Sequence, residues 1–284
     1  MSAARGMTRW ETGICDVVSA EGHEGVIVRG HRLSDLVGRV SFAEMMFLLI
    51  QGHEPSKPQA RVLEGLLVAS MEHGIAPPSM ISRCLASYGS PIQAAVAGGV
   101  LAFGDWMGGA GEDFARLLVR HLGPIEREQA AIDDETLCEL ARKIVETAVG
   151  AKDRIPGFGI PLHKADPRAP ALLGLARGEG VYGRYCRLAT LIEDELEKHA
   201  GHRIPMNLDG VGAAIILDLG FDWRLARLFI ITPRTVSMGA HYLEELGQDT
   251  RWRHVPQSLI EYRPVNTGSR DLRAGQGERG PSTS

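Results

Sequence analysis

Helical periodicity along nearly the whole chain is the feature that most constrains the fold. From about residue 41 to residue 246, apolar side chains recur three and four positions apart, as they do on the buried face of an α-helix. Only residues 25–28 and their surroundings have the pattern of a strand, and that pattern is short. The sequence therefore predicts an all-α protein, with helices at about 41–49, 57–73, 79–87, 92–103, 111–121, 134–149, 181–199, 209–219, 222–232 and 234–246.

Local signals mark several helix ends. Ser41 is followed three residues later by Glu44, the spacing of a capping box, and Gly52 lies where that helix would end. Gly74 is a natural stop for the next helix. Segment 92–103 (IQAAVAGGVLAF) is small and apolar all round, which predicts a helix buried on every side.

Length and charge exclude some classes of protein. The chain has 284 residues, enough for one large domain or two smaller ones with an ample core. Its formal net charge of -4 argues against a nucleic-acid-binding surface, which needs a basic footprint. No stretch reaches the ~18 apolar residues that a membrane helix requires, and none resembles a signal peptide.

The four cysteines (Cys15, Cys84, Cys138 and Cys186) have no C-x-x-C spacing. Scattered cysteines favour reduced thiols, so we expect a cytoplasmic protein. The polar, glycine-rich end of the chain, residues 274–284 (AGQGERGPSTS), is expected not to fold by itself.

The stretch IPGFGIPLHKADPRA, residues 155–169, is the strongest candidate for a binding loop. Gly157 and Gly159 leave the backbone bare, so a ligand can approach it closely. Pro161 and Pro167 fix the backbone φ angle on either side. Arg168 carries a planar guanidinium that suits a carboxylate or a phosphate.

This stretch resembles a loop of the citrate synthase superfamily that reads P-G-F-G-H-x-x-x-K-x-D-P-R. Residues 28–55, 70–87, 104–112, 207–210 and 233–245 resemble further motifs of that family in the same chain order. The resemblance covers about residues 25–265, and the short length is most similar to the citryl-CoA lyase-type members. Several motifs in order are far more specific than a single glycine pair.

The resemblance implies a citrate synthase-like fold with a ligand cleft between two helical domains. The large domain would comprise residues 1–106 and 214–284, and the small domain residues 107–213. It also implies a homodimer acting on an acyl-CoA and a small carboxylic or 2-oxo acid. Coenzyme A thioester would then be a co-substrate, and no cofactor would be bound permanently.

In such a site Asp209 resembles the base that removes a proton beside the thioester carbonyl. Burial in a closed cleft would strengthen it, because the charged carboxylate loses hydration. From the sequence NLDG alone, Asp209 could equally cap the helix at 209–219. The same residue could act both as the base and as the cap.

The other site residues follow from the resemblance in the same way. The oxo acid would be bound by His73, Arg168 and Arg234. Arg263 would contribute to the site of the second subunit. Gly157, Phe158, Gly159 and Lys164 would bind coenzyme A. Considered one at a time, each arginine is better explained as a surface residue. His73 is better explained as a histidine at a helix end, where it would bond free carbonyl groups.

Two positions depart from the family pattern. Met107 stands where the family has the histidine that supports the enolate, and Ile160 where it has the histidine that supports the alkoxide. Losing an acid–base group typically slows a reaction ~10²–10⁴-fold, and losing an oxyanion donor ~10²–10³-fold. The usual mechanism therefore cannot run unchanged, and either His163 as a catalytic group or the indole of Trp106 could substitute. His163 could equally belong to the coenzyme A loop, with a structural hydrogen bond.

Three functions remain open from the sequence. The first is carbon–carbon bond formation or cleavage with a modified mechanism. The second is a changed reaction on the same scaffold, such as hydrolytic or retro-Claisen cleavage of a more apolar substrate. The third is a non-catalytic binding or regulatory relative. No metal site is expected, since His199 and His202 lack a partner at ligand spacing.

Overall fold

The computed structural model describes residues 10–20, 23–128, 132–159, 166–249 and 251–263, and the prediction of an all-α protein is confirmed. Three short strands form one antiparallel sheet near the N-terminus: β1 (Cys15–Ala20), β2 (His23–Val28) and β3 (His31–Arg32). The α-helices are α1 (Leu33–Leu36), α2 (Phe42–Gln51), α3 (Lys57–Ser70), α4 (Pro77–Ser87), α5 (Ile92–Leu101), α6 (Ala110–Glu128), α7 (Asp134–Ala151), α8 (Arg168–Gly178), α9 (Arg184–Ala200), α10 (Leu208–Asp218) and α11 (Ala226–Gly247). Two 3₁₀ turns, η1 (Trp223–Leu225) and η2 (Gln257–Leu259), complete the described chain.

The predicted helix ends are largely correct. Ser41 and Glu44 form the expected capping box of α2, and Gly52 takes the left-handed conformation after it, with φ 83°. One expectation was wrong and one helix was missed. The segments 222–232 and 234–246 are not separate helices, since α11 runs through both with Pro233 inside it. Helix α8 was not predicted at all.

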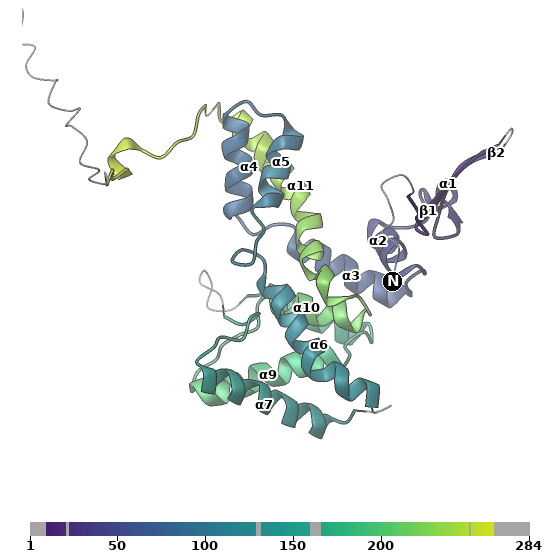
Figure 1. Ribbon diagram of the computed structural model, residues 1–284, viewed down its shortest axis with the longest axis vertical. Coiled ribbons are helices and arrows are strands. Elements are labelled where there is room, and N and C mark those ends of the chain that lie inside the picture. Colours follow the sequence, from purple (N-terminus) through teal and green to yellow (C-terminus); the bar gives the residue numbers. More distant parts are fainter. Residues whose placement is uncertain (1–9, 21–22, 129–131, 160–165, 250, 264–284) are drawn as a thin grey trace, which may run out of the picture.

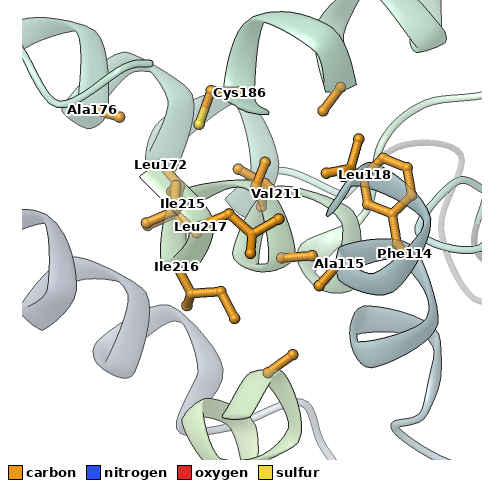
Figure 2. Packing of buried hydrophobic residues seen from close by; sticks show 14 of the residues in the cluster. Phe114, Ala115, Leu118, Leu172, Ala176, Cys186, Val211, Ile215, Ile216 and Leu217 are labelled. Carbon is orange, nitrogen blue, oxygen red and sulfur yellow. The ribbon is translucent and has the colours of Figure 1, made fainter. Parts of the chain in front are cut away.

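Helix α10 lies at the centre of the hydrophobic core. It packs against α3, α6, α8 and α9, and its buried side chains include Val211, Ile215 and Ile216. Figure 2 shows these residues facing side chains of the surrounding helices, among them Phe114 and Leu118 of α6. Because a helix that is apolar all round must be covered on every side, α10 requires these neighbours.

A second group of helices, which we call the arm, consists of α4, α5 and the part of α11 from residue 234 onward. Figure 1 shows the arm extending away from the helices around α10. Within the arm α5 packs mainly on α4 and α11. The prediction that segment 92–103 is buried on every side is therefore wrong for this chain by itself: Ala95 and Gly99 are buried, whereas Leu101 is 84% exposed.

The core does not stop at the predicted domain boundary. Buried residues of α2 and α3, such as Phe47 and Leu63, belong to the same cluster as those of α6 to α10. Division of the chain at residues 107 and 213 stays a prediction. Within the described residues, no helix is both long and apolar enough to span a membrane.

Candidate active site

A cavity of about 460 Å³ lies where the arm meets the helices around α10. Its volume is in the range of small-molecule sites. Six segments of the chain form its wall: the α3–α4 connection, the turn before α6, the loop ending at Gly159, the start of α8, the start of α10, and the middle of α11. The polar lining residues are His73, Asp105, Asp166, Arg168, Asn207, Asp209 and Arg234, and the apolar ones include Ile75, Pro77, Phe103, Trp106, Met107 and Ile230.

Asp209 lies in the first turn of α10 and is not the cap of that helix. The cap is Asn207, whose side-chain oxygen accepts the backbone N–H of Gly210 at 3.1 Å. No residue in the described part of the chain donates a hydrogen bond to the Asp209 carboxylate. Burial raises the pKa of Asp209, while the charges of Arg168 and Arg234 oppose the rise. The result is a carboxylate that is more basic than an exposed one and has free lone pairs.

Arg234 is held by the backbone of another helix and keeps its terminal nitrogens available. It is buried in the middle of α11, and its Nε donates to the carbonyl oxygen of Ser70 at 2.6 Å. No described residue accepts a hydrogen bond from its two terminal nitrogens. Burial lowers the pKa of Arg234, but a guanidinium stays charged in proteins. An anionic ligand group in the cavity would satisfy these donors.

Arg168 differs from the expectation of a free guanidinium. Its Nε and one terminal nitrogen already form a bidentate pair with Asp166, at 2.9 and 2.8 Å. Asp166 is 2% exposed and also accepts the backbone N–H of Leu208, so it joins the start of α8 to the start of α10. Burial alone would raise the pKa of Asp166, but the hydrogen bonds and charge of Arg168 lower it overall.

The glycines of the predicted binding loop have two different surroundings. Gly157 has φ +86°, and a Cβ atom there would lie 2.7 Å from the Cα of Gly210. Glycine at this position is thus needed for close backbone packing beside Asp209. Gly159 has φ +72° and lines the cavity. Its carbonyl oxygen accepts the side-chain amide of Asn207 at 2.8 Å, which fixes the loop against the start of α10.

A second cavity of about 280 Å³ lies on the other side of this loop. Phe158 and Gly159 line it together with Ile155, Ile204 and Arg154. Gly159 borders both cavities. An elongated ligand that crosses the loop would therefore contact the bare backbone between them.

The turn before α6 presents Met107 to the main cavity. Gly104 and Met107 exchange backbone hydrogen bonds of 3.0 and 3.2 Å, which closes a two-residue turn with Trp106 fully exposed at its tip. Arg227 of α11 holds this turn through Asp105, at 3.0 Å, and also pairs with Glu112 at the start of α6. The Met107 side chain has no hydrogen-bond donor.

The structure thus brings together four of the predicted site residues, His73, Arg168, Asp209 and Arg234, with Gly159. Arg263 is exposed and pairs with Glu261, outside the cavity of this chain. Its predicted role in a second subunit stays a prediction. His163, Lys164 and Ile160 lie outside the described residues, so their predicted roles are untested.

Sequence reasoning missed Asp166 and Asn207 as residues that shape the site. The sequence Asp-Pro-Arg contained a signal for the pairing of Asp166, because it places an acidic residue two positions before an arginine. Asn207 precedes Gly210 by three residues, which is the spacing of a helix cap.

Comparison with known proteins agrees with this geometry. The family described as citrate synthase, C-terminal domain, matches residues 50–263. The chain is 34% identical to citryl-CoA lyase from Hydrogenobacter thermophilus, with a TM-score of 0.80 over 93% of this chain and 97% of that one. An ATP citrate lyase from Methanothrix soehngenii shares the fold at 20% identity, with a TM-score of 0.74 over 92% of this chain and 43% of that one.

Curated citrate synthases are more distant and longer. The enzyme of Heyndrickxia coagulans is 25% identical over 82% of this chain, and the citrate/2-methylcitrate synthase of Bacillus subtilis is 26% identical over 75%. The chain spans 58% and 55% of their lengths. Since the family match covers most of the sequence and the fold agrees with it, this chain belongs to the citrate synthase family.

Proposed function

We propose that the protein makes or cleaves a carbon–carbon bond between an acyl-CoA and a 2-oxo acid. One observation carries the proposal: the Asp209 carboxylate, whose pKa burial raises, shares a cavity with Arg168 and with Arg234, and no described residue bonds the carboxylate or the terminal nitrogens of Arg234. A base and a carboxylate-binding cation in one closed space are what this chemistry requires.

In the synthetic direction Asp209 takes a proton from the carbon next to the thioester carbonyl, and the electron pair moves onto the carbonyl oxygen as an enolate. The enolate carbon then attacks the ketone carbon of the oxo acid. A new carbon–carbon bond forms, and the ketone oxygen becomes an alkoxide that takes up a proton. In the cleavage direction the alcohol loses that proton, the bond breaks, and protonated Asp209 returns its proton to the enolate carbon.

The arginines orient the acid for this step. A carboxylate bound to the terminal nitrogens of Arg234 would lie in the same cavity as Asp209. Arg168 adds positive charge, although its Nε and one terminal nitrogen already donate to Asp166. The coenzyme would cross the loop at Gly159 with the acyl group in the main cavity and its far end in the second one.

The enolate is stabilised differently here than in relatives that have histidine at the position of Met107. This methionine and its neighbours Ile75, Phe103 and Ile230 give one wall of the cavity an apolar character. That observation favours a second candidate function, cleavage of a bulkier and more apolar acid on the same scaffold.

A turnover assay tests the function. The purified chain is incubated with acetyl-CoA and oxaloacetate, with citryl-CoA, and with longer acyl-CoA thioesters, and the products are identified by mass spectrometry. We expect interconversion of acyl-CoA and oxo acid with their condensation product. Turnover of the longer substrates alone would support the second function.

Absence of turnover in every mixture would contradict both functions and leave a binding relative. In that case the double variant Met107→His with Ile160→His would show whether the remaining site is competent. Recovery of citrate chemistry in this variant would identify the two replacements as the cause of the loss.

We further propose that the protein works as a homodimer joined through the arm. Helix α5 leaves its apolar outer face uncovered, and exposed apolar side chains continue onto α4 and α11: Met80, Ile92, Leu101, Val236 and Leu243. Monomeric proteins rarely expose large apolar patches, so this concentration of exposed apolar side chains on one group of helices favours an interface with a second copy.

Leu101→Glu is expected to convert the dimer into a folded monomer, because a carboxylate cannot be buried unpaired between two copies of α5. Light scattering after size-exclusion chromatography measures the mass. Val37→Glu is the matched control, since Val37 is 75% exposed but lies outside the arm. A monomeric wild type, or a Leu101→Glu variant that stays dimeric, would contradict an interface on α5.

A further inference from the structure

Two side chains, those of Glu72 and Ser79, hold the connection between α3 and α4 in shape. The Ser79 hydroxyl accepts the backbone N–H of Ala76 at 2.9 Å and lies 3.0 Å from the carbonyl oxygen of Gly74. Residues 71–76 are not helical, and they carry His73 into the main cavity. The carboxylate of Glu72 accepts the backbone N–H of His73, at 2.9 Å, and the backbone N–H of Gly74. Gly74 has φ +73°, so the chain reverses sharply there. Glu72 thus helps to fix the turn in which His73 lies, and its two bonds are at His73 and Gly74 themselves.

The same carboxylate reaches across to α11. The hydroxyl of Ser237 donates a hydrogen bond to Glu72, and Nε2 of His241 lies 3.3 Å from it. Ser237 and His241 follow Arg234 by three and seven residues, so all three share one face of α11. A single carboxylate therefore ties the turn of His73 to the helix face that carries Arg234.

The charge of Glu72 matters as well as its hydrogen bonds. Burial alone would raise its pKa, but the bonds from Ser237, Gly74, His241 and His73 lower it overall, so the group is ionised at neutral pH. Its charge acts on Arg234, which has few other partners. This carboxylate has no place in the proposed proton transfers, since it lines neither cavity.

We propose that Glu72 is a positioning residue that sets the distance between His73 and Arg234 and thereby the affinity for the carboxylate end of the acid substrate. The proposal rests on the proposed function and deepens it. Because Glu72 contacts no described residue that lines the second cavity, we expect the effect to be specific to the acid.

Other bonds between the same segments keep the fold intact when Glu72 is changed. Arg234 donates to the carbonyl of Ser70, and Ser82 of α4 donates to the carbonyl of Met238 at 3.1 Å. Arg83 of α4 also bonds Glu245 of α11 at 2.7 Å. A variant at position 72 therefore loses the alignment of two side chains and keeps the packing of α3, α4 and α11.

Three variants separate the charge of Glu72 from its bonds to the turn and its bonds to α11. Glu72→Gln removes the charge. Glu72→Asp keeps a carboxylate that can accept the N–H of Gly74, as aspartate does in turns, but is too short to reach α11. Ser237→Ala removes one bond to α11 alone. The matched control is Glu244→Gln, also in α11, whose carboxylate contacts Arg83 and His241 but not the turn.

Steady-state kinetics with oxaloacetate and acetyl-CoA, and calorimetric titration with citrate, give the readout. In all three variants we expect KM for the oxo acid to rise, by about 10-fold for Glu72→Gln, which corresponds to the loss of one charged hydrogen bond. KM for acetyl-CoA, kcat and the melting temperature should stay close to wild type. Glu244→Gln should leave every value unchanged.

Different results separate this proposal from the proposed function. Turnover by the wild type with an unchanged KM in Glu72→Gln overturns the positioning role and leaves the function standing. A chain without turnover that binds citrate, and loses that binding in Glu72→Gln, supports the role and contradicts the function. Loss of kcat in proportion to loss of stability shows a purely structural residue. A wild type that neither turns over nor binds citrate overturns both.

Discussion

Replacing Asp209 with asparagine is expected to remove the carbon–carbon bond chemistry and to make the protein more stable at neutral pH. An amide cannot accept the proton, and losing a positioned acid–base group lowers the rate by ~10²–10⁴-fold. The cavity keeps its shape, because asparagine is nearly the same size and Asp209 has no hydrogen bond from the described residues to lose.

The expected gain in stability follows from the direction of the pKa shift. Burial raises the pKa of Asp209, so the folded chain holds this proton to a higher pH than the unfolded chain does. The free energy of unfolding therefore falls as pH rises from the ordinary pKa of an aspartate through the raised one. A neutral amide at this position has no such penalty, so the stability advantage of Asp209→Asn should appear over that interval and persist above it.

Kinetics and urea unfolding at a series of pH values measure both effects. Asp218→Asn is the matched contrast. Asp218 is also a buried aspartate with a raised pKa, but it accepts the backbone N–H groups of Gly183, Tyr185 and Cys186 at 2.9–3.0 Å. Its replacement should destabilise the start of α9. An Asp209→Asn variant with wild-type rates, or one destabilised like Asp218→Asn, would contradict the assignment of Asp209 as the base.

Replacing Arg234 with methionine is expected to raise KM for the oxo acid by about 10–100-fold, the loss of a hydrogen-bonded charge pair. Arg234 also lowers the pKa of Asp209. Its removal should therefore raise that pKa further and move the acidic limb of the kcat/KM profile to higher pH. The loss of stability should stay at about 1–3 kcal/mol, because the only bond to a described residue that the variant loses is the one from Nε to the carbonyl oxygen of Ser70.

Arg168→Met is the contrasting variant. The Arg168 guanidinium is paired with Asp166, which is 2% exposed, so removing it leaves a buried carboxylate without its partner. Breaking a buried pair in this way costs about 3–5 kcal/mol. Chemical denaturation and steady-state kinetics distinguish the two arginines. Equal losses of stability in both variants, or an unchanged KM in Arg234→Met, would contradict the ligand-binding role of Arg234.

Much of the fold could be predicted because local rules decide it. The capping box of Ser41 and Glu44 and the left-handed Gly52 depend on residues within one turn, and both are as expected. The motifs around Asp209 and Arg234 indicated the family, and the structure places both residues in one cavity.

The errors arise where distant segments decide the outcome. Helices α5 and α10 are both rich in small apolar residues, yet α10 packs against five α-helices and α5 mainly against two. Nothing within either segment distinguishes these surroundings. Pro233 reads as a helix break, but α11 continues through it because its packing against α3, α4 and α5 on both sides outweighs one lost backbone hydrogen bond.

In the site too, local sequence predicts some features, and the packing of distant segments decides the others. Residue types predicted which side chains could act, but not which of their donors were already used. The engagement of Arg168 by Asp166, and the cap formed by Asn207 in place of Asp209, depend on the approach of α8 to α10. Only the folded chain reveals that Arg234 is the arginine with donors to spare.

The central claim is that Asp209 acts as a base on the carbon beside a thioester carbonyl. The most direct test dissolves the chain with acetyl-CoA in heavy water and follows the methyl signal by NMR, with and without oxaloacetate. We predict that the wild type replaces methyl protons with deuterium and that Asp209→Asn does not. No exchange by the wild type under either condition, or equal exchange by the variant, would contradict the claim.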